Sequence, residues 1–78
     1  MKDDDLPPLT AIATGRYRHY KGGEYEVLDT ARHSETLEPM VVYRALYGAR
    51  RVWVRPAQMW SEWVVHDGRE VQRFVRCQ

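Results

Sequence analysis

The sequence predicts a small all-β domain, and three observations support this fold class. Short runs of Val, Tyr, Trp and Thr recur from Gly15 onward, separated by Gly, Pro and Asp. None of these runs has a helical period, and apolar and polar residues tend to alternate. A chain of 78 residues has room for only one hydrophobic core. We therefore expect one domain over residues 14–78, preceded by a flexible N-terminal arm, residues 1–13, rich in Asp and Pro.

Six segments carry the strand pattern. In chain order they are Arg16–Tyr20, Glu24–His33, Met40–Tyr47, Val52–Arg55, Ser61–His66 and Val71–Arg76. Residues Pro56–Trp60 interrupt the pattern and fit a single 3₁₀ turn, because proline cannot donate a hydrogen bond to a central strand. This order is typical of an SH3-like barrel, whose closure hides the edges of a small sheet. We expect such a barrel of five to six short antiparallel strands, with the last hairpin as an addition.

The first hairpin can be given a register from its loop. A three-residue loop at Lys21–Gly23 contains glycine that is free to take a positive φ. The resulting register pairs Tyr17 with Val27, Arg18 with Glu26 and His19 with Tyr25. It gathers the aromatic side chains on one face and sets an ion pair on the other, so we prefer it to the register of a two-residue loop.

The last hairpin is indicated by Asp67-Gly68, the strongest short signal for a two-residue type I′ turn. Counting outward from this turn pairs Val64 with Val71 and Glu62 with Arg73. Both pairs match chemically, one apolar and one of opposite charge, which supports the register.

Metal and disulfide chemistry finds little support in the sequence. The single cysteine, Cys77, has no partner, and no CxxC or Cys/His ligand spacing surrounds it. The histidines His19, His33 and His66 follow no ligand spacing, whereas a closed zinc site needs about four donors. We expect no disulfide, no metal and no cofactor.

The N-terminal sequence MKDDDLPPLTAIATG lacks the basic and long apolar regions of a signal peptide. No run in the chain approaches the roughly 18 apolar residues of a membrane span. We therefore expect a cytoplasmic protein that does not contact a membrane.

The charge of the chain is carried mainly by arginine. The formal net charge is +1, but from Thr10 onward the chain has 11 basic and 8 acidic residues, a net charge of +3. Ten of the twelve basic residues are Arg, whose planar guanidinium binds phosphate and carboxylate groups and stacks on aromatic rings. The excess is compatible with an anionic or aromatic partner, although arginine side chains also simply cover the surfaces of small β proteins.

The nine aromatic side chains are too many for the core of so small a domain. One interpretation buries Tyr43, Tyr47, Trp53 and Phe74 and leaves the others at the rim with their polar atoms in water. The other interpretation exposes an aromatic surface beside Arg, as in small barrels that bind peptides, methylated side chains or nucleobases. Some aromatic rings must be exposed in either case.

The polar segment His33–Thr36 has two interpretations. Adjacent residues on a strand alternate faces, so His33, Ser34 and Glu35 do not form a catalytic triad. Ser34 or Thr36 would instead cap the turn between the second and third strands, or the whole loop would contact a ligand. In the second case Arg44 and Arg55 would supply a cationic rim, and Trp53 or Tyr47 an apolar floor. The candidate ligand-binding residues are His19, His33, Ser34, Glu35, Thr36, Arg44, Tyr47, Trp53 and Arg55.

The stretch GRYRHYKGGEYEVLDTARHSETLEPMVVYRALYG, with WVRPAQMW and DGREVQRF after it, resembles a small bacterial family known as domain of unknown function 1653. The resemblance covers Gly15 to Val75. It implies a short bacterial cytosolic domain that usually stands alone. It implies no activity, because none is assigned to the family.

Three functions remain open from the sequence. The leading hypothesis is a non-enzymatic module that binds a protein or peptide through an aromatic and arginine surface. The alternative is a domain that binds RNA or another single-stranded nucleic acid by stacking and charge. The third is a small enzyme, or an accessory to one, that uses His19, His33 and Glu35; no catalytic residue is assigned, because so small a domain has little room for a substrate pocket. The sequence leaves the oligomeric state open.

Overall fold

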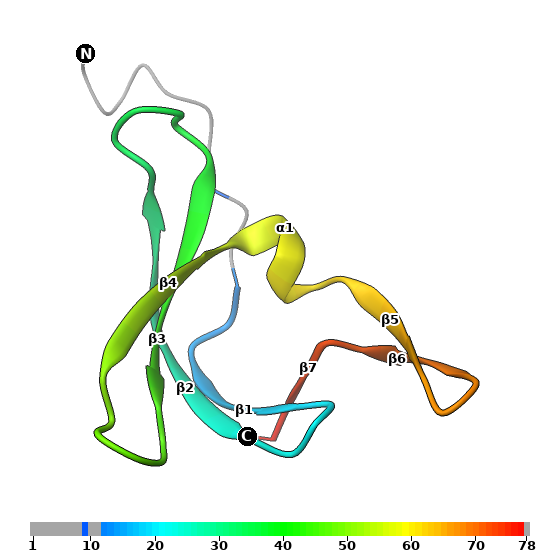
Figure 1. Cartoon of the computed structure of the whole chain (residues 1–78). Helices are drawn as coiled ribbons and strands as arrows, with labels where there is room; N and C mark the ends of the chain where they lie inside the picture. Colours follow the sequence, from blue (N-terminus) through cyan, green and yellow to red (C-terminus); the bar gives the residue numbers. More distant parts are fainter. Residues whose placement is uncertain (1–8, 10–11, 78) are drawn as a thin grey trace.

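The structure is a computed structural model that describes Leu9 and residues 12–77. Seven strands and one short helix follow one another along the chain (Figure 1). They are β1 (Gly15–His19), β2 (Glu24–Arg32), β3 (Pro39–Ala45), β4 (Val52–Pro56), α1 (Ala57–Trp60), β5 (Trp63–His66), β6 (Arg69–Gln72) and β7 (Phe74–Arg76). The predicted all-β class is confirmed. No helix in the described part of the chain is long and apolar enough to cross a membrane.

Five strands form one antiparallel sheet in the order β4-β3-β2-β1-β7, and β5 and β6 form a separate hairpin. This separate hairpin is the addition that the sequence predicts, and it projects to one side of the sheet in Figure 1. Among the described strands no pairing joins β4 to β7, so the sheet bends without closing into the predicted barrel. β7 has only three residues, which pair with β1 and leave little length for a second partner strand.

The described residues form seven strands rather than five to six because the last predicted segment divides at Arg73. The Arg73 N–H donates to the Glu62 carbonyl at 2.8 Å, on the side of the β5–β6 hairpin, while its carbonyl accepts from the Tyr20 N–H at 3.0 Å. The backbone of Arg73 thus leaves one sheet and joins the other. The predicted 3₁₀ turn at Pro56–Trp60 is a single α-helical turn, α1, which begins one residue later.

The predicted register of the last hairpin is confirmed. Val64 pairs with Val71, and the Arg73 guanidinium lies 2.9 Å from the Glu62 carboxylate. Asp67 and Gly68 both have positive φ, 53° and 75°, as a type I′ turn requires.

The predicted register of the first hairpin is wrong by two residues. Tyr17 pairs with Tyr25 rather than with Val27, and Arg18 pairs with Glu24 rather than with Glu26. A shift of two keeps every side chain on its predicted face, because successive residues of a strand alternate. The two tyrosines therefore still share the inner face of the sheet.

The cause of this shift is the position of the loop. The His19 N–H donates to the Gly23 carbonyl at 2.8 Å, so the three loop residues are 20–22 and not 21–23. The glycine that takes the positive φ is Gly22, at 106°. Both placements use a three-residue loop, so loop length alone did not decide between them.

The core lies on the inner face of the sheet, under α1. Trp60 is 1% exposed and stacks on Phe74 with 3.7 Å between ring centroids. The other buried residues of the cluster are Tyr17, Val27, Val41, Tyr43 and Ala57. The interpretation that buries four aromatics is therefore correct for Tyr43 and Phe74 only, since Tyr47 and Trp53 are 54% and 57% exposed.

The predicted N-terminal arm, residues 1–13, is mostly outside the described residues. Ile12 and Ala13 are described, and Ile12 packs against the core cluster. The carbonyl of Ala13 accepts a hydrogen bond from the Tyr17 hydroxyl at 2.8 Å. The described chain is therefore already attached to the sheet before β1 begins.

Candidate functional site

An exposed aromatic hollow lies beside the loop between β3 and β4. The ladder sets Trp53 of β4 opposite Tyr43 of β3, and Ala45 of β3 opposite Tyr25 of β2. Three aromatic residues therefore project from neighbouring strands on the inner face, and Tyr47 of the loop joins them. These four residues, Tyr25, Tyr43, Tyr47 and Trp53, are called the aromatic hollow below.

The volume of the hollow is about 280 Å³. This is near the lower limit of roughly 300 Å³ for small-molecule sites, so the hollow suits a side chain or two rather than a large ligand. Tyr25 packs edge-on against Tyr43 and Tyr47, each at 5.5 Å between ring centroids. The hydroxyls of Tyr25 and Tyr47 lie 2.6 Å apart in a hydrogen bond. These contacts position the three tyrosine rings against one another along one side of the hollow.

Tyr25 is not suited to act as a base. Burial, together with the hydrogen bond to Tyr47, raises the pKa of Tyr25 to about 12. The hydroxyl of Tyr25 thus stays protonated at physiological pH. It offers a hydrogen-bonding group to a ligand but no base.

The hairpin that carries most of the hollow is rich in arginine. Residues 39–56, called the β3–β4 hairpin below, contain four arginines and no Asp or Glu. Arg50 and Arg51 line the hollow itself. The Arg44 guanidinium donates to the Arg50 carbonyl at 2.7 Å and fixes the loop, and the Arg55 guanidinium lies 5.6 Å from the centre of the Phe74 ring. The hairpin is therefore a cationic surface with exposed aromatic rings.

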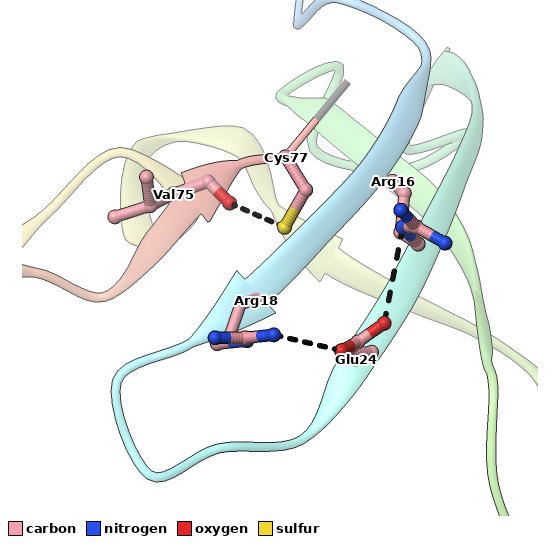
Figure 2. Close-up of polar contacts among 5 residues, drawn as sticks. All are labelled: Arg16, Arg18, Glu24, Val75 and Cys77. Atoms are coloured by element: carbon pink, nitrogen blue, oxygen red, sulfur yellow. Dashed lines mark hydrogen bonds and ion pairs between the residues drawn. The ribbon is translucent and has the colours of Figure 1, made fainter.

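Three arginines elsewhere in the fold, Arg16, Arg18 and Arg73, have acidic partners. Figure 2 shows Glu24 of β2 between Arg16 and Arg18 of β1, with distances of 3.8 Å and 3.0 Å between charged atoms. The pair between Arg73 and Glu62 at the base of the β5–β6 hairpin is similar. The β3–β4 hairpin itself contains no acidic residue, and Glu26 of β2 lies opposite one of its four arginines, Arg44, in the ladder.

His19 lies at the other side of Phe74 from the hollow. Its ring packs edge-on against Phe74 at 4.9 Å, and its Nδ1 accepts the Lys21 N–H at 3.1 Å. Burial lowers the pKa of His19, and the positive charges of Arg55, Arg73 and Lys21 lower it further. His19 is therefore neutral at pH 7, and it caps the first hairpin loop.

The predicted residues of the His33 loop lie far from the hollow along the sheet. This loop precedes β3, whereas the loop of the aromatic hollow follows it, so the two lie at opposite ends of the strand (Figure 1). His33 Nδ1 accepts the N–H groups of Glu35 and Thr36 at 3.1 Å and 3.2 Å. Thr36 Oγ1 accepts the Glu38 N–H at 3.4 Å. These bonds match the turn-capping interpretation, with His33 as the main acceptor, while Ser34 and Glu35 are exposed.

The structure thus brings together Arg44, Tyr47, Trp53 and Arg55 on one hairpin and leaves His33–Thr36 apart. Four residues of this surface, Tyr25, Tyr43, Arg50 and Arg51, were not among the candidates. The signal that would have found the two arginines is the absence of acidic residues over residues 39–56. Within the described residues no group of three or more metal-ligating side chains occurs.

A second cavity, of about 550 Å³, lies where the first hairpin loop meets β7 and the β5–β6 hairpin. Its lining includes Tyr20 and His66, whose rings meet edge-on at 5.1 Å. Cys77 also lines it, and its Sγ lies 3.8 Å from the Val75 carbonyl (Figure 2). This cavity was not predicted from the sequence, because it forms between segments that are distant along the chain.

Comparison with known proteins gives a family and a related fold. A family model described as protein of unknown function (DUF1653) matches residues 15–76. The crystal structure of a DUF1653 protein from Bordetella bronchiseptica is similar, with a TM-score of 0.75 and 38% sequence identity. The similarity covers 81% of this chain and 83% of that chain. No curated protein matches the sequence.

Proposed function

This chain belongs to the DUF1653 family, as its sequence predicts, and we propose that it is a non-enzymatic module that binds a protein or peptide. The binding surface is the aromatic hollow together with the arginines of the β3–β4 hairpin. The observation that carries this proposal is the exposure of Tyr47 and Trp53, 54% and 57%, among arginines that have no acidic residue in their hairpin.

Exposure of these side chains is costly without a partner. A large aromatic ring left in water forgoes roughly 1.5–3 kcal/mol of burial energy. Tyr, Trp and Arg are also the residues most often found at the energetic centres of protein interfaces. The hollow has room for one or two side chains of a partner, and the guanidinium groups of Arg50 and Arg51 can donate hydrogen bonds to its carboxylates.

The enzyme hypothesis has less support from the geometry. His19 lies beside the loop at the start of β2, whereas His33 and Glu35 follow its end. The three residues that this hypothesis needs are thus separated by the length of a nine-residue strand. The proposal therefore assigns them no shared reaction.

Nucleic acid is the second candidate partner. Tyr47 and Trp53 are exposed beside arginine, and base stacking on such rings contributes roughly 1–3 kcal/mol per base. The formal net charge of only +1 makes it the weaker candidate. The predicted cytoplasmic location stays a prediction for either partner.

A peptide selection tests the proposal. Random peptides displayed on phage are selected on the wild-type protein, and the enriched peptides are measured against Trp53→Ala and Trp63→Ala. Trp63 is the matched control because it is 63% exposed and lies on the β5–β6 hairpin. We expect Trp53→Ala to weaken binding by roughly tenfold or more, as loss of an interface centre does, and Trp63→Ala to leave it unchanged.

Two outcomes contradict the proposal. One is a selection that enriches no peptide, and the other is a set of enriched peptides that bind Trp53→Ala as well as wild type. A 12-nucleotide oligouridine is titrated in parallel at low and high salt. Binding of this RNA that depends on Trp53 and disappears at high salt, with no enriched peptide, would replace the peptide by nucleic acid.

A further inference from the structure

The site also contains a free sheet edge. In the order β4-β3-β2-β1-β7, β4 has a neighbouring strand on one side only among the described residues. β4 has five residues, whereas the opposite edge strand, β7, has three. Short edge strands offer little to a pairing partner, so β4 is the edge with more length to offer.

The direction of the backbone groups on β4 follows from its pairing with β3. The Ala45 N–H donates to the Arg51 carbonyl at 3.2 Å. Antiparallel ladders alternate pairs that exchange hydrogen bonds with pairs that do not, so the odd-numbered residues of β4 face β3. Val52 and Val54 therefore direct their N–H and C=O groups to the free edge. A new strand would find two donors and two acceptors there.

The side chains around this edge offer contacts on both faces. Val52 and Val54 are 47% and 59% exposed on the outer face of the sheet. Trp53 and the aromatic hollow lie on the inner face. An incoming strand alternates its side chains between the same two faces, so it contacts the two valines with one set and the hollow with the other.

We propose that the partner of this site is an extended acidic segment that adds to the free edge of β4 as a further strand. This inference rests on the proposed function and names the chemistry and the conformation of the bound peptide. Its acidic character follows from charge, because the β3–β4 hairpin has four arginines and no acidic residue. Arg51 directly precedes β4 and Arg55 lies within it, so carboxylates at both ends of the added strand find a cation.

The same charges disfavour two other occupants of the edge. A second copy that pairs its own β4 antiparallel about Trp53 places Arg51 of one copy opposite Arg55 of the other, and like charges directly opposite destabilise a sheet. The phosphates of a nucleic acid would neutralise the arginines, but a nucleic acid has no row of amide groups to hydrogen-bond with the free backbone groups of Val52 and Val54. An acidic peptide neutralises the arginines with its carboxylates and hydrogen-bonds to the free edge of β4 with its own backbone. Pro56 limits the added strand, because it ends β4 and has no N–H.

Amide hydrogen exchange tests this pairing directly. The probe is a capped heptapeptide of alternating Glu and Val, and its control carries Lys in place of Glu. At saturation with the Glu peptide, exchange of the Val52 and Val54 amides slows by roughly tenfold or more, as new hydrogen bonds require. The Trp53 amide already faces β3 and keeps its rate. A bound Glu peptide that leaves both valine amides unprotected overturns the inference, and so does equal binding of the Lys peptide.

A matched pair of variants tests the same point from the protein side. Val54→Pro removes the outward N–H at a position where an edge strand tolerates proline. Val54→Thr keeps the N–H and the branched side chain. We expect the first variant to weaken binding of the Glu peptide by roughly tenfold and the second by less than about twofold. Equal binding to both variants overturns strand addition.

If Val54→Pro fails to fold, N-methylation of alternate residues of the probe gives the same test on wild-type protein. A peptide so modified loses its donors, and we expect it not to bind. Binding that survives N-methylation but is lost in Trp53→Ala overturns strand addition and leaves the proposed function standing. The proposed function itself fails if no peptide depends on Trp53. Oligouridine that displaces the Glu peptide and protects neither valine amide would make nucleic acid the occupant.

Discussion

The β3–β4 hairpin and the β5–β6 hairpin each expose a tryptophan, but their surroundings differ. Trp53 lies among four arginines and three tyrosines, beside a hollow and a free strand edge. Trp63 lies on a two-stranded sheet, and residues 61–72 contain three acidic residues and one arginine. The exposure of the tryptophan ring is therefore similar in the two hairpins. What distinguishes the β3–β4 hairpin is that charge, concavity and unpaired backbone occur together there.

The two hairpins also differ in how they are held. The β5–β6 hairpin is attached to the sheet through Arg73, which joins both sheets by its backbone and bonds to Glu62. The edge strand of the β3–β4 hairpin pairs along its whole length with a central strand of the main sheet. A binding surface on a hairpin that is paired with the main sheet is pre-organised, so that less conformational entropy is lost when a partner binds.

The largest effect is expected from the one tryptophan that belongs to neither hairpin. Trp60 is 1% exposed and stacks on Phe74, so Trp60→Ala opens a cavity and costs about 3–5 kcal/mol. Trp53→Ala and Trp63→Ala each cost less than about 1 kcal/mol, because both side chains are largely in water. Urea denaturation of the three variants measures the difference. If Trp63→Ala lowered the free energy of unfolding by several kcal/mol, the β5–β6 hairpin would support the core, which contradicts the comparison made above.

A smaller effect is expected from the two loop glycines. Gly48 and Gly68 have φ of 58° and 75°, and a Cβ at either position meets no atom within 4 Å. Alanine at either position costs about 1 kcal/mol, since the left-handed region disfavours residues with a Cβ. Thermal melting should give similar losses for the two variants. Only Gly48→Ala should also weaken peptide binding, because Gly48 lines the aromatic hollow; equal binding by both variants would contradict the site.

The β1–β2 hairpin and the β5–β6 hairpin show how much of the fold was predictable. Asp67-Gly68 takes a two-residue turn, so counting outward gave the correct pairs of the last hairpin. The first hairpin has two adjacent glycines, and either one satisfies a loop of three residues, so the choice between them depended on packing. The interpretation that buries four aromatics left Trp60 at the rim, but Trp60 is buried in the single helical turn α1. Such a turn has no period to indicate burial, and only the stacking on Phe74 reveals its role.

The candidate site was predicted in part for a similar reason. Trp53, Tyr47 and Arg55 were found because their residue types suit a ligand surface, and the ladder does place them on one hairpin. The His33 loop was included on composition alone, but strand order sends it to the other end of β3. Tyr25 was missed as a site residue because its role depends on the approach of Tyr47, 22 residues away along the chain. Residue type indicated the chemistry of the site, whereas which residues belong to the site depends on their proximity in the folded chain.

The smallest effect concerns His19, which connects the charge of the β3–β4 hairpin to stability. Its pKa in the folded state is lowered, first by burial and then by Arg55, Arg73 and Lys21. Between this lowered pKa and the unfolded value of about 6.5, the unfolded chain binds more protons than the folded chain. The contribution of His19 is therefore fully present above about pH 6.5 and is lost as the pH falls. His19→Gln should remove this part of the acid dependence of the urea midpoint.

Arginine variants on the two hairpins identify the source of the shift. Arg55→Gln removes the largest charge contribution, so the pKa of His19 should rise toward its usual value and less stability should be lost in acid. Arg69→Gln, on the β5–β6 hairpin, removes one positive charge as well but is not among the groups that lower this pKa. Titration of the His19 ring by NMR in both variants measures the two effects. An equal rise of the His19 pKa in both variants would mean that this pKa responds to the net charge of the protein and not to the nearby charge of Arg55.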